Sequence, residues 1–160
     1  MLLKTPAEFT ASLPAHSRLL GLDVGDKTIG LALSDALRTI ATPYDTIRRS
    51  KFTKDAETLA TIISEQKIGG LVIGYPVNMD GSEGPRCQST RTFVSNLQKT
   101  ISLPMLLWDE RMSTMAVQRM MTDEADMSRA RRAELVDKLA ASYMLQGYLN
   151  SLSSPPCAGI

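Results

Sequence analysis

The sequence has little of several residue types on which common kinds of site depend. Among 160 residues there are two cysteines, Cys87 and Cys157, and one histidine. So few thiols and imidazoles do not favour a disulfide framework, a zinc–thiolate centre or a Ser-His or Cys-His catalytic pair. Aromatic residues make up 5% of the chain, which leaves few rings for stacking nucleic-acid bases. We therefore expect any nucleic-acid ligand to be held through its backbone more than its bases.

Long hydrophobic runs and a large excess of one charge are also missing. No segment approaches membrane-spanning length, and the first residues, MLLKTPAEFTASLPAHSR, lack the apolar core of a signal peptide. With so few cysteines and no secretory segment, the sequence predicts a cytoplasmic protein with no membrane partner. The formal net charge is only +1, but basic residues gather at Arg48 and Arg49 and again at Arg131 and Arg132.

The length of the chain suits one domain with two less regular ends. Residues 18–150 carry the hydrophobic patterns and are expected to form the domain. In the N-terminal extension, residues 1–17, the segment Thr5-Pro6-Ala7-Glu8 matches a helix-capping pattern with proline at the first helical position. This extension is expected to be a short, loosely attached helix or disordered. Residues 151–160, SLSSPPCAGI, are expected to be a disordered tail.

The hydrophobic periodicity within the domain predicts a mixed sheet with helices on both faces. Alternation indicates strands over 19–25 and 29–35, joined by a tight turn, and an edge strand over about 40–47 that contains Pro43. Helical spacing then begins at Phe52, with Gly69-Gly70 predicted to end the helix before a buried strand, LVIGY. A helix, the strand LPMLLWDE, a helix opening at Ser113 or Thr114 and a long helix over about 131–150 follow.

This order is β-β-β-α-β-α-β-α-α, which predicts an α/β fold of the ribonuclease H-like kind. Three antiparallel strands come first, and right-handed β-α-β crossovers then complete a five-stranded mixed sheet. In such a sheet, one carboxylate on the first central strand, Asp23, converges with Glu110 after the last strand and Asp137 on the last helix. Hydrolysis of a phosphodiester requires a hard divalent cation, which carboxylates, waters and substrate phosphates bind together. The three acids are therefore candidate catalytic residues and ligands of Mg²⁺ or Mn²⁺.

Each acid also has a simpler explanation. Asp23 would then be a structural aspartate that accepts hydrogen bonds from the backbone. Glu110 would stabilise the positive N-terminus of the helix that follows it, and Asp137 would be a solvated charge at the border of an apolar helix face. Three acids at the expected places in one fold favour the catalytic interpretation.

Four stretches, GLDVGDKTIGLALSD, IGYPVNMDGSEG, WDERMST and VDKLAASYMLQGYL, carry a resemblance to a known family. In this order and spacing they resemble the YqgF/RuvX family of bacterial ribonuclease H-like proteins over about residues 18–150. The resemblance implies a nuclease that processes pre-16S ribosomal RNA or, by similarity to junction resolvases, a Holliday junction resolvase. The family's acidic motif positions fall on Asp23, Glu110 and Asp137, the same three residues.

The chain departs from the family pattern at Thr28, where members commonly carry a basic residue that would contact phosphate. Related nucleases use a fourth carboxylate, for which Glu134 is a candidate, although a plain surface acid is an alternative explanation of that residue. The residues expected to contact nucleic acid are mostly basic, and they are Lys27, Arg48, Arg49, Asn78, Arg111, Arg131 and Arg132.

Other function classes compete with a nuclease. The segment around Asp23 also resembles the phosphate loop of actin-like and sugar-kinase-like ATPases, but those need two such lobes and this chain has one. A non-catalytic factor that binds ribosomal RNA is a further alternative, against which the retention of all three acids argues. The expected partner is nucleic acid, either a ribosomal RNA precursor or a four-way DNA junction, bound by a monomer or a homodimer.

Overall fold

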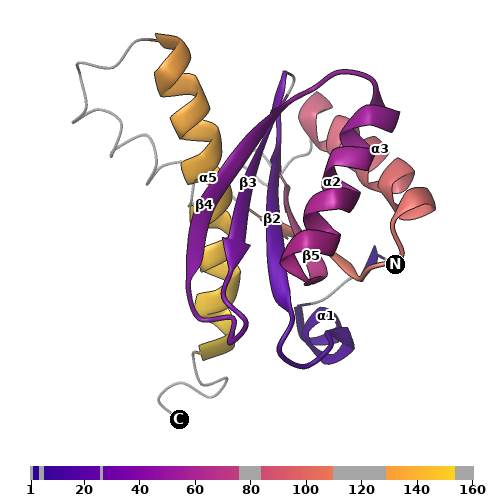
Figure 1. The fold of residues 1–160 in the computed structure, drawn as a ribbon, viewed down its shortest axis with the longest axis vertical. Helices are drawn as coiled ribbons and strands as arrows, with labels where there is room; N and C mark the ends of the chain where they lie inside the picture. The colour runs from indigo at the N-terminus through magenta and orange to yellow at the C-terminus, as the bar shows by residue number, and fades with distance from the viewer. Residues whose placement is uncertain (1, 4–5, 26, 76–83, 110–128, 154–160) are drawn as a thin grey trace.

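A computed structural model describes residues 2–3, 6–25, 27–75, 84–109 and 129–153 of the chain. At its centre is a six-stranded sheet with the strand order β1-β6-β5-β2-β3-β4. The strands are β1 (Leu2–Leu3), β2 (Arg18–Val24), β3 (Thr28–Ser34), β4 (Ala41–Arg48), β5 (Ile68–Tyr75) and β6 (Met105–Asp109). Helices cover both faces of this sheet (Figure 1).

Strands β2, β3 and β4 form an antiparallel meander, because short turns connect runs that alternate between two faces. Leu22 pairs with Leu31 across β2 and β3, and Ile29 pairs with Ile47 across β3 and β4. Pro43 lies in β4, at the outer edge of the sheet, where a residue without a backbone donor costs no ladder hydrogen bond. The predicted hairpin and the predicted edge strand are confirmed.

Parallel pairing begins after the meander. Helix α2 (Phe52–Gln66) leads to β5, which pairs parallel to β2, and α3 (Pro85–Thr100) precedes β6, which pairs parallel to β5. Both helices pack on one face of the sheet, where Leu59, Phe93 and Leu97 share a core with Leu22. Helix α5 (Arg129–Ser153) covers the other face, where Leu145 packs with Leu19 and Val72. The predicted ribonuclease H-like sheet of five strands is thus confirmed, and β1 adds a short sixth strand beside β6.

Two element boundaries differ from the prediction. Helix α2 ends at Gln66. Its C-cap residue, Lys67, adopts a left-handed φ of 55° and donates its backbone N–H to Ile63 O, so Gly69 and Gly70 belong to β5 and do not end the helix. At the other end of the domain, α5 continues to Ser153, so the first residues of the expected tail are helical. The helix predicted to open at Ser113 or Thr114 lies outside the described residues.

The N-terminal extension contributes strand β1 to the sheet and helix α1 (Pro6–Ser12) to the core beneath α5. Helix α1 is the predicted short helix, and its Phe9 is completely buried in the same core as α5. The Phe9 ring meets the Tyr148 ring edge to face, with centroids 5.5 Å apart, and Thr10 Oγ1 lies 2.6 Å from Tyr148 Oη in a hydrogen bond. The helix is therefore packed against the domain, in contrast to the loose attachment that the sequence suggested.

Candidate active site

Asp23 lies one residue before the end of β2, on the face of the sheet that α5 covers. Its neighbours Leu22 and Val24 point into the core shared with α2 and α3, and Leu19 belongs to the core beneath α5. Because successive side chains of a strand point to opposite faces, Asp23 shares the face of Leu19. The residue is half-buried. A carboxylate there is close enough to solvent to meet a substrate, but partly shielded from water.

Glycines surround Asp23 in the sheet. Along the chain, Gly21 and Gly25 are its nearest neighbours on the same face, and across the hairpin Asp23 pairs with Gly30. On the other side, Gly74 directly follows Ile73, the partner of Leu22 in β5. None of these four positions carries a side chain; over Gly21 the space is occupied by Leu145 of α5, and a Cβ atom on Gly25 would lie 3.1 Å from Thr28 O.

Helix α5 passes over this face in the direction opposite to β2. A Cβ atom on Gly21 would lie 3.0 Å from Leu145 Cβ and 3.4 Å from Ala141 O, so these residues flank the middle of β2. Farther along α5, Gln146 contacts Thr39 and Ala41, at the other end of the sheet. The part of α5 that precedes Ala141, including the backbone of Asp137 one turn earlier, therefore extends toward the end of β2 that carries Asp23.

The side chains of the other predicted acids lie outside the described part of the structure. Glu110 follows Asp109, the last residue of β6, and neither its backbone nor its side chain is described; for Asp137 and Glu134 only the helical backbone is described. Within the described part of the chain, no group of three or more His, Cys, Asp or Glu residues is gathered in one place. The structure thus describes one carboxylate of the predicted set and the course of the helix that carries a second.

Three of the predicted basic residues gather near the turn that follows Asp23. Arg49 donates a hydrogen bond of 2.7 Å from Nη1 to Gly25 O, and its backbone N–H donates to Lys27 O at 2.8 Å. Arg49 is half-buried, whereas Lys27 and Arg48 are exposed. Arg48 is paired with Thr28 in the β3–β4 ladder. Asn78 and Arg111 lie outside the described residues, and of Arg131 and Arg132 only the backbone on α5 is described.

The model of the family described as "RuvX: Holliday junction resolvase" matches residues 17–151 of this chain. The chain belongs to the RuvX family. The match covers the whole of the domain from β2 to α5, and the predicted family is confirmed.

Curated relatives in this family match over nearly their whole length. A protein of Paramagnetospirillum magneticum is 61% identical over 153 residues, which are 96% of this chain and 98% of the relative. A protein of Roseobacter denitrificans is 53% identical over 154 residues, which are 95% of this chain and 94% of the relative. Both bear the name "Putative pre-16S rRNA nuclease".

A solved structure with the same fold is that of Thermus thermophilus RuvC. Its complex with a Holliday junction substrate superposes with a TM-score of 0.52 at 11% sequence identity, covering 86% of this chain and 96% of RuvC. A second structure of Thermus thermophilus RuvC gives a TM-score of 0.51 at 10% identity, covering 85% of this chain and 96% of RuvC. At this level of identity the likeness establishes that the RuvX chain has the RuvC fold.

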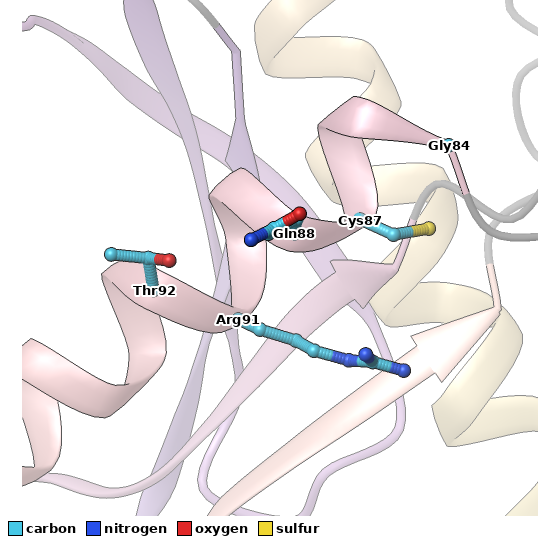
Figure 2. Close-up of a pocket in the computed structure, with 5 residues that line it drawn as sticks. All are labelled: Gly84, Cys87, Gln88, Arg91 and Thr92. Carbon is cyan, nitrogen blue, oxygen red and sulfur yellow. The ribbon is translucent and has the colours of Figure 1, made fainter.

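The RuvX chain also has functional candidates that its sequence did not indicate. Two adjoining hollows open on the first turns of α3. The first is lined by Gly84, Cys87, Gln88, Arg91 and Thr92 (Figure 2). The second is lined by Arg49, Pro85, Gln88, Ser89 and Thr92. Of these residues only Arg49 was predicted to bind a ligand. The sequence pattern contained no signal for Arg91, because its partner in the fold, Tyr75, is distant along the chain.

Proposed function

We propose that this RuvX protein is a metal-dependent nuclease that hydrolyses phosphodiester bonds. The observation that supports this most is the position of Asp23, a half-buried carboxylate on the central strand with glycine on every neighbouring position of its face. Withdrawing a carboxylate from water is costly. Packing against Leu145 of α5 explains Gly21, but a structural aspartate would not by itself need glycine at Gly30 and Gly74, its neighbours in β3 and β5. A site for a cation and a phosphate needs both the charge and the space.

We assign Asp23, Glu110 and Asp137 as the ligands of Mg²⁺ or Mn²⁺. Carboxylate oxygens are the donors that these hard cations prefer, and the half-buried position of Asp23 suits an ion that keeps part of its water. When bound, the ion supplies stabilisation of the charge that develops on the attacking and leaving oxygens. Asp23 supplies negative charge from a central strand, where its partner in β3 is Gly30, which has no side chain. Lys27, exposed on the adjoining turn, supplies positive charge toward substrate phosphates.

The substrate that we propose is the 5′ region of precursor 16S ribosomal RNA, processed during ribosome biogenesis in the cytoplasm. Support comes from the relatives at 61% and 53% identity, whose name specifies a pre-16S rRNA nuclease. Among the described residues, no helix is long and apolar enough to cross a membrane. Aromatic residues make up only 5% of the chain, which agrees with a ligand held through its phosphates.

A second candidate substrate is a four-way DNA junction. The description of the matching family model names a Holliday junction resolvase, and the chain has the fold of RuvC. The two substrates share the phosphodiester chemistry and differ in shape, so one catalytic variant tests the chemistry on both.

The decisive variant is Asp23→Asn, which preserves the size of the side chain and removes the charge that holds the cation. We expect cleavage of a 5′-extended 16S precursor RNA to fall at least about 100-fold, because one ligand of the catalytic ion is removed. Binding of the same RNA should be nearly unchanged. Cleavage is measured by gel analysis in Mg²⁺, and binding is measured separately in chelator, where the wild-type enzyme should not cut.

Asp45→Asn is a matched control, because Asp45 is an exposed carboxylate on the edge strand β4. This control should cleave as the wild type does. Equal cleavage by the wild type and Asp23→Asn, or full wild-type cleavage in excess chelator, would contradict the proposal. If the wild type cuts the four-way junction and not the RNA, the second substrate replaces the first. If it binds RNA without cutting, a non-catalytic RNA-binding role becomes the better explanation.

A further inference from the structure

The first turns of helix α3, which packs on the face of the sheet opposite to that of Asp23, form a polar groove. It consists of two hollows with volumes of about 430 Å³ and 400 Å³, which we call together the α3 groove. Gln88 and Thr92 line both hollows, so the two adjoin. Arg91 lines the first hollow and Arg49 the second. Each hollow therefore contains one guanidinium group, and the polar side chains of Gln88 and Thr92 line both.

Both arginines are supported by aromatic rings. The guanidinium carbon of Arg91 lies 5.5 Å from the centroid of the Tyr75 ring, and that of Arg49 lies 5.5 Å from the centroid of Phe93. Such contacts restrain a long side chain while preserving its charge. Because less side-chain entropy is lost on binding, restrained guanidinium groups are well suited to hold an anion.

The remaining groove residues also favour an anionic ligand. Gln88, Ser89 and Thr92 are exposed and carry hydrogen-bond donors, and Figure 2 shows Gln88 one turn of α3 before Arg91 and Thr92. Among the described residues that line the two hollows, none is acidic. These side chains provide no negative charge to bind a cation and little apolar surface to bind an apolar group.

The α3 groove is connected to the turn that follows Asp23. Arg49 contributes to both, because it lines the groove while Nη1 donates to Gly25 O at 2.7 Å. Gly25 is two residues beyond Asp23. On the other side, Arg91 contacts Tyr75, the last residue of β5, which is the strand beside β2. The groove thus begins at the end of the sheet where the candidate catalytic carboxylate lies.

We propose that the α3 groove binds backbone phosphates of the RNA strand that flanks the cleavage point. This inference rests on the nuclease function proposed above and adds Arg91, Gln88 and Thr92 to the substrate-binding residues. Arg91 contacts one phosphate through its guanidinium edge, and Gln88 and Thr92 donate hydrogen bonds to its neighbours. Because these interactions are made with phosphates, they position the strand without selecting its sequence.

The test compares Arg91→Ala with Lys99→Ala. Both remove one exposed positive charge from α3, but Lys99 lies in the last turn of the helix, outside the groove. Affinity for a single-stranded precursor RNA is measured in chelator over a range of salt concentrations. Arg91→Ala should weaken binding about tenfold, as expected when a charge-assisted hydrogen bond is removed. It should also reduce the slope of log affinity against log salt by about 0.7, the value for one phosphate that is no longer neutralised. Lys99→Ala should change neither.

Three further measurements separate a binding role from a structural one. Gln88→Glu places a negative charge in the shared part of the groove, in the first turns of a helix where an acidic residue does not destabilise, and it should weaken binding as Arg91→Ala does. In cleavage assays, Arg91→Ala should raise KM with kcat little changed, because it removes binding that ground state and transition state share. Arg91→Lys should restore part of the affinity and of the salt slope.

The inference is overturned if Arg91→Ala and Lys99→Ala behave alike, or if Gln88→Glu binds RNA as tightly as the wild type. A failure of the proposed function has a different signature, since Asp23→Asn would then cleave as the wild type does. The binding measurements in chelator do not depend on cleavage, so they decide the role of the groove in either case.

Discussion

Asp35, at the end of β3, accepts three hydrogen bonds from residues in the turn to β4. Thr39 donates its backbone N–H to Oδ1 and its hydroxyl to Oδ2, both at 2.7 Å, and Ile40 N–H donates to Oδ1 at 3.2 Å. These donors, the Thr39 hydroxyl first, hold the pKa of Asp35 below its ordinary value of 3.8, because they stabilise the ionised form. The carboxylate thus fixes the turn only while it is charged.

Asp35→Ala should therefore lower the free energy of unfolding at neutral pH by about 0.5–1 kcal/mol, a modest loss because solvent screens this half-buried surface group. A group whose folded pKa is depressed contributes stability above its unfolded pKa, and this contribution is lost as the pH falls through the folded value. The difference between wild type and variant should shrink below pH 3.8. Urea unfolding at several pH values checks this, and a pH-independent difference would contradict the electrostatic explanation.

At the residue scale, the sequence predicted what alternation and local chemistry determine. Asp23 could be assigned to its face because Leu22 and Val24 flank it in a strand of period two. The role of Gly74 could not be predicted, since only the pairing of β5 with β2 places it beside Asp23. Arg91 was not predicted for the same reason: its ring partner, Tyr75, is brought to it by the β5–α3 connection and not by sequence spacing.

At the scale of elements, the distance between α5 and β2 depends on Gly21. A Cβ atom there would lie 3.0 Å from Leu145 Cβ and 3.3 Å from Leu145 Cδ2, closer than carbon atoms pack without displacement. The absence of a side chain at Gly21 therefore lets the helix approach the sheet. Asp137 lies on the same helix. This contact therefore also affects the distance between the first half of α5 and β2, the strand that contains Asp23.

Gly21→Ala should destabilise the protein by about 1–3 kcal/mol, the usual cost of inserting a methyl group into a well-packed contact. It should also lower kcat for RNA cleavage, since the shift of α5 changes the separation of the proposed metal ligands, while RNA binding through the α3 groove persists. Gly147→Ala is the control, because a Cβ atom there would lie an ordinary 3.4 Å from Trp108 Nε1. Equal kcat in Gly21→Ala and the wild type would contradict this dependence.

The elements themselves were largely predictable, and the exceptions have tertiary causes. The strands of the meander follow from alternation, and the helices follow from the spacing of their apolar residues. The glycine pair after α2 has the composition of a helix stop, but a Cβ on Gly69 would lie 2.1 Å from Ser17 Oγ, and one on Gly70 would lie 2.5 Å from Leu13 Cδ2. Because these glycines have no side chains, the N-terminal segment can pack against β5. No local sequence pattern indicates this contact.

At the scale of the whole molecule, the N-terminal segment completes the core beneath α5. Phe9 is fully buried, Tyr148 is fully buried beside it, and the Trp108 ring meets Tyr148 edge to face at 5.7 Å between centroids. Burial raises the pKa of Tyr148 above its ordinary value of 10.0. The aromatic cluster thus ties α1, β6 and α5 into one unit, with Tyr148 neutral at physiological pH.

Phe9→Ala should consequently behave as a core substitution and lower the free energy of unfolding by about 3–5 kcal/mol, through reduced burial and the cavity left behind. Leu37→Ala, at a side chain that is 74% exposed, removes a large apolar group from the surface and should stay within about 0.5 kcal/mol of the wild type. Chemical denaturation measures both. Removal of residues 1–17 should be at least as destabilising as Phe9→Ala, because it uncovers the glycine surface of β5 as well. If Phe9→Ala were as mild as Leu37→Ala, the segment would be an appendage, and the domain would begin at β2.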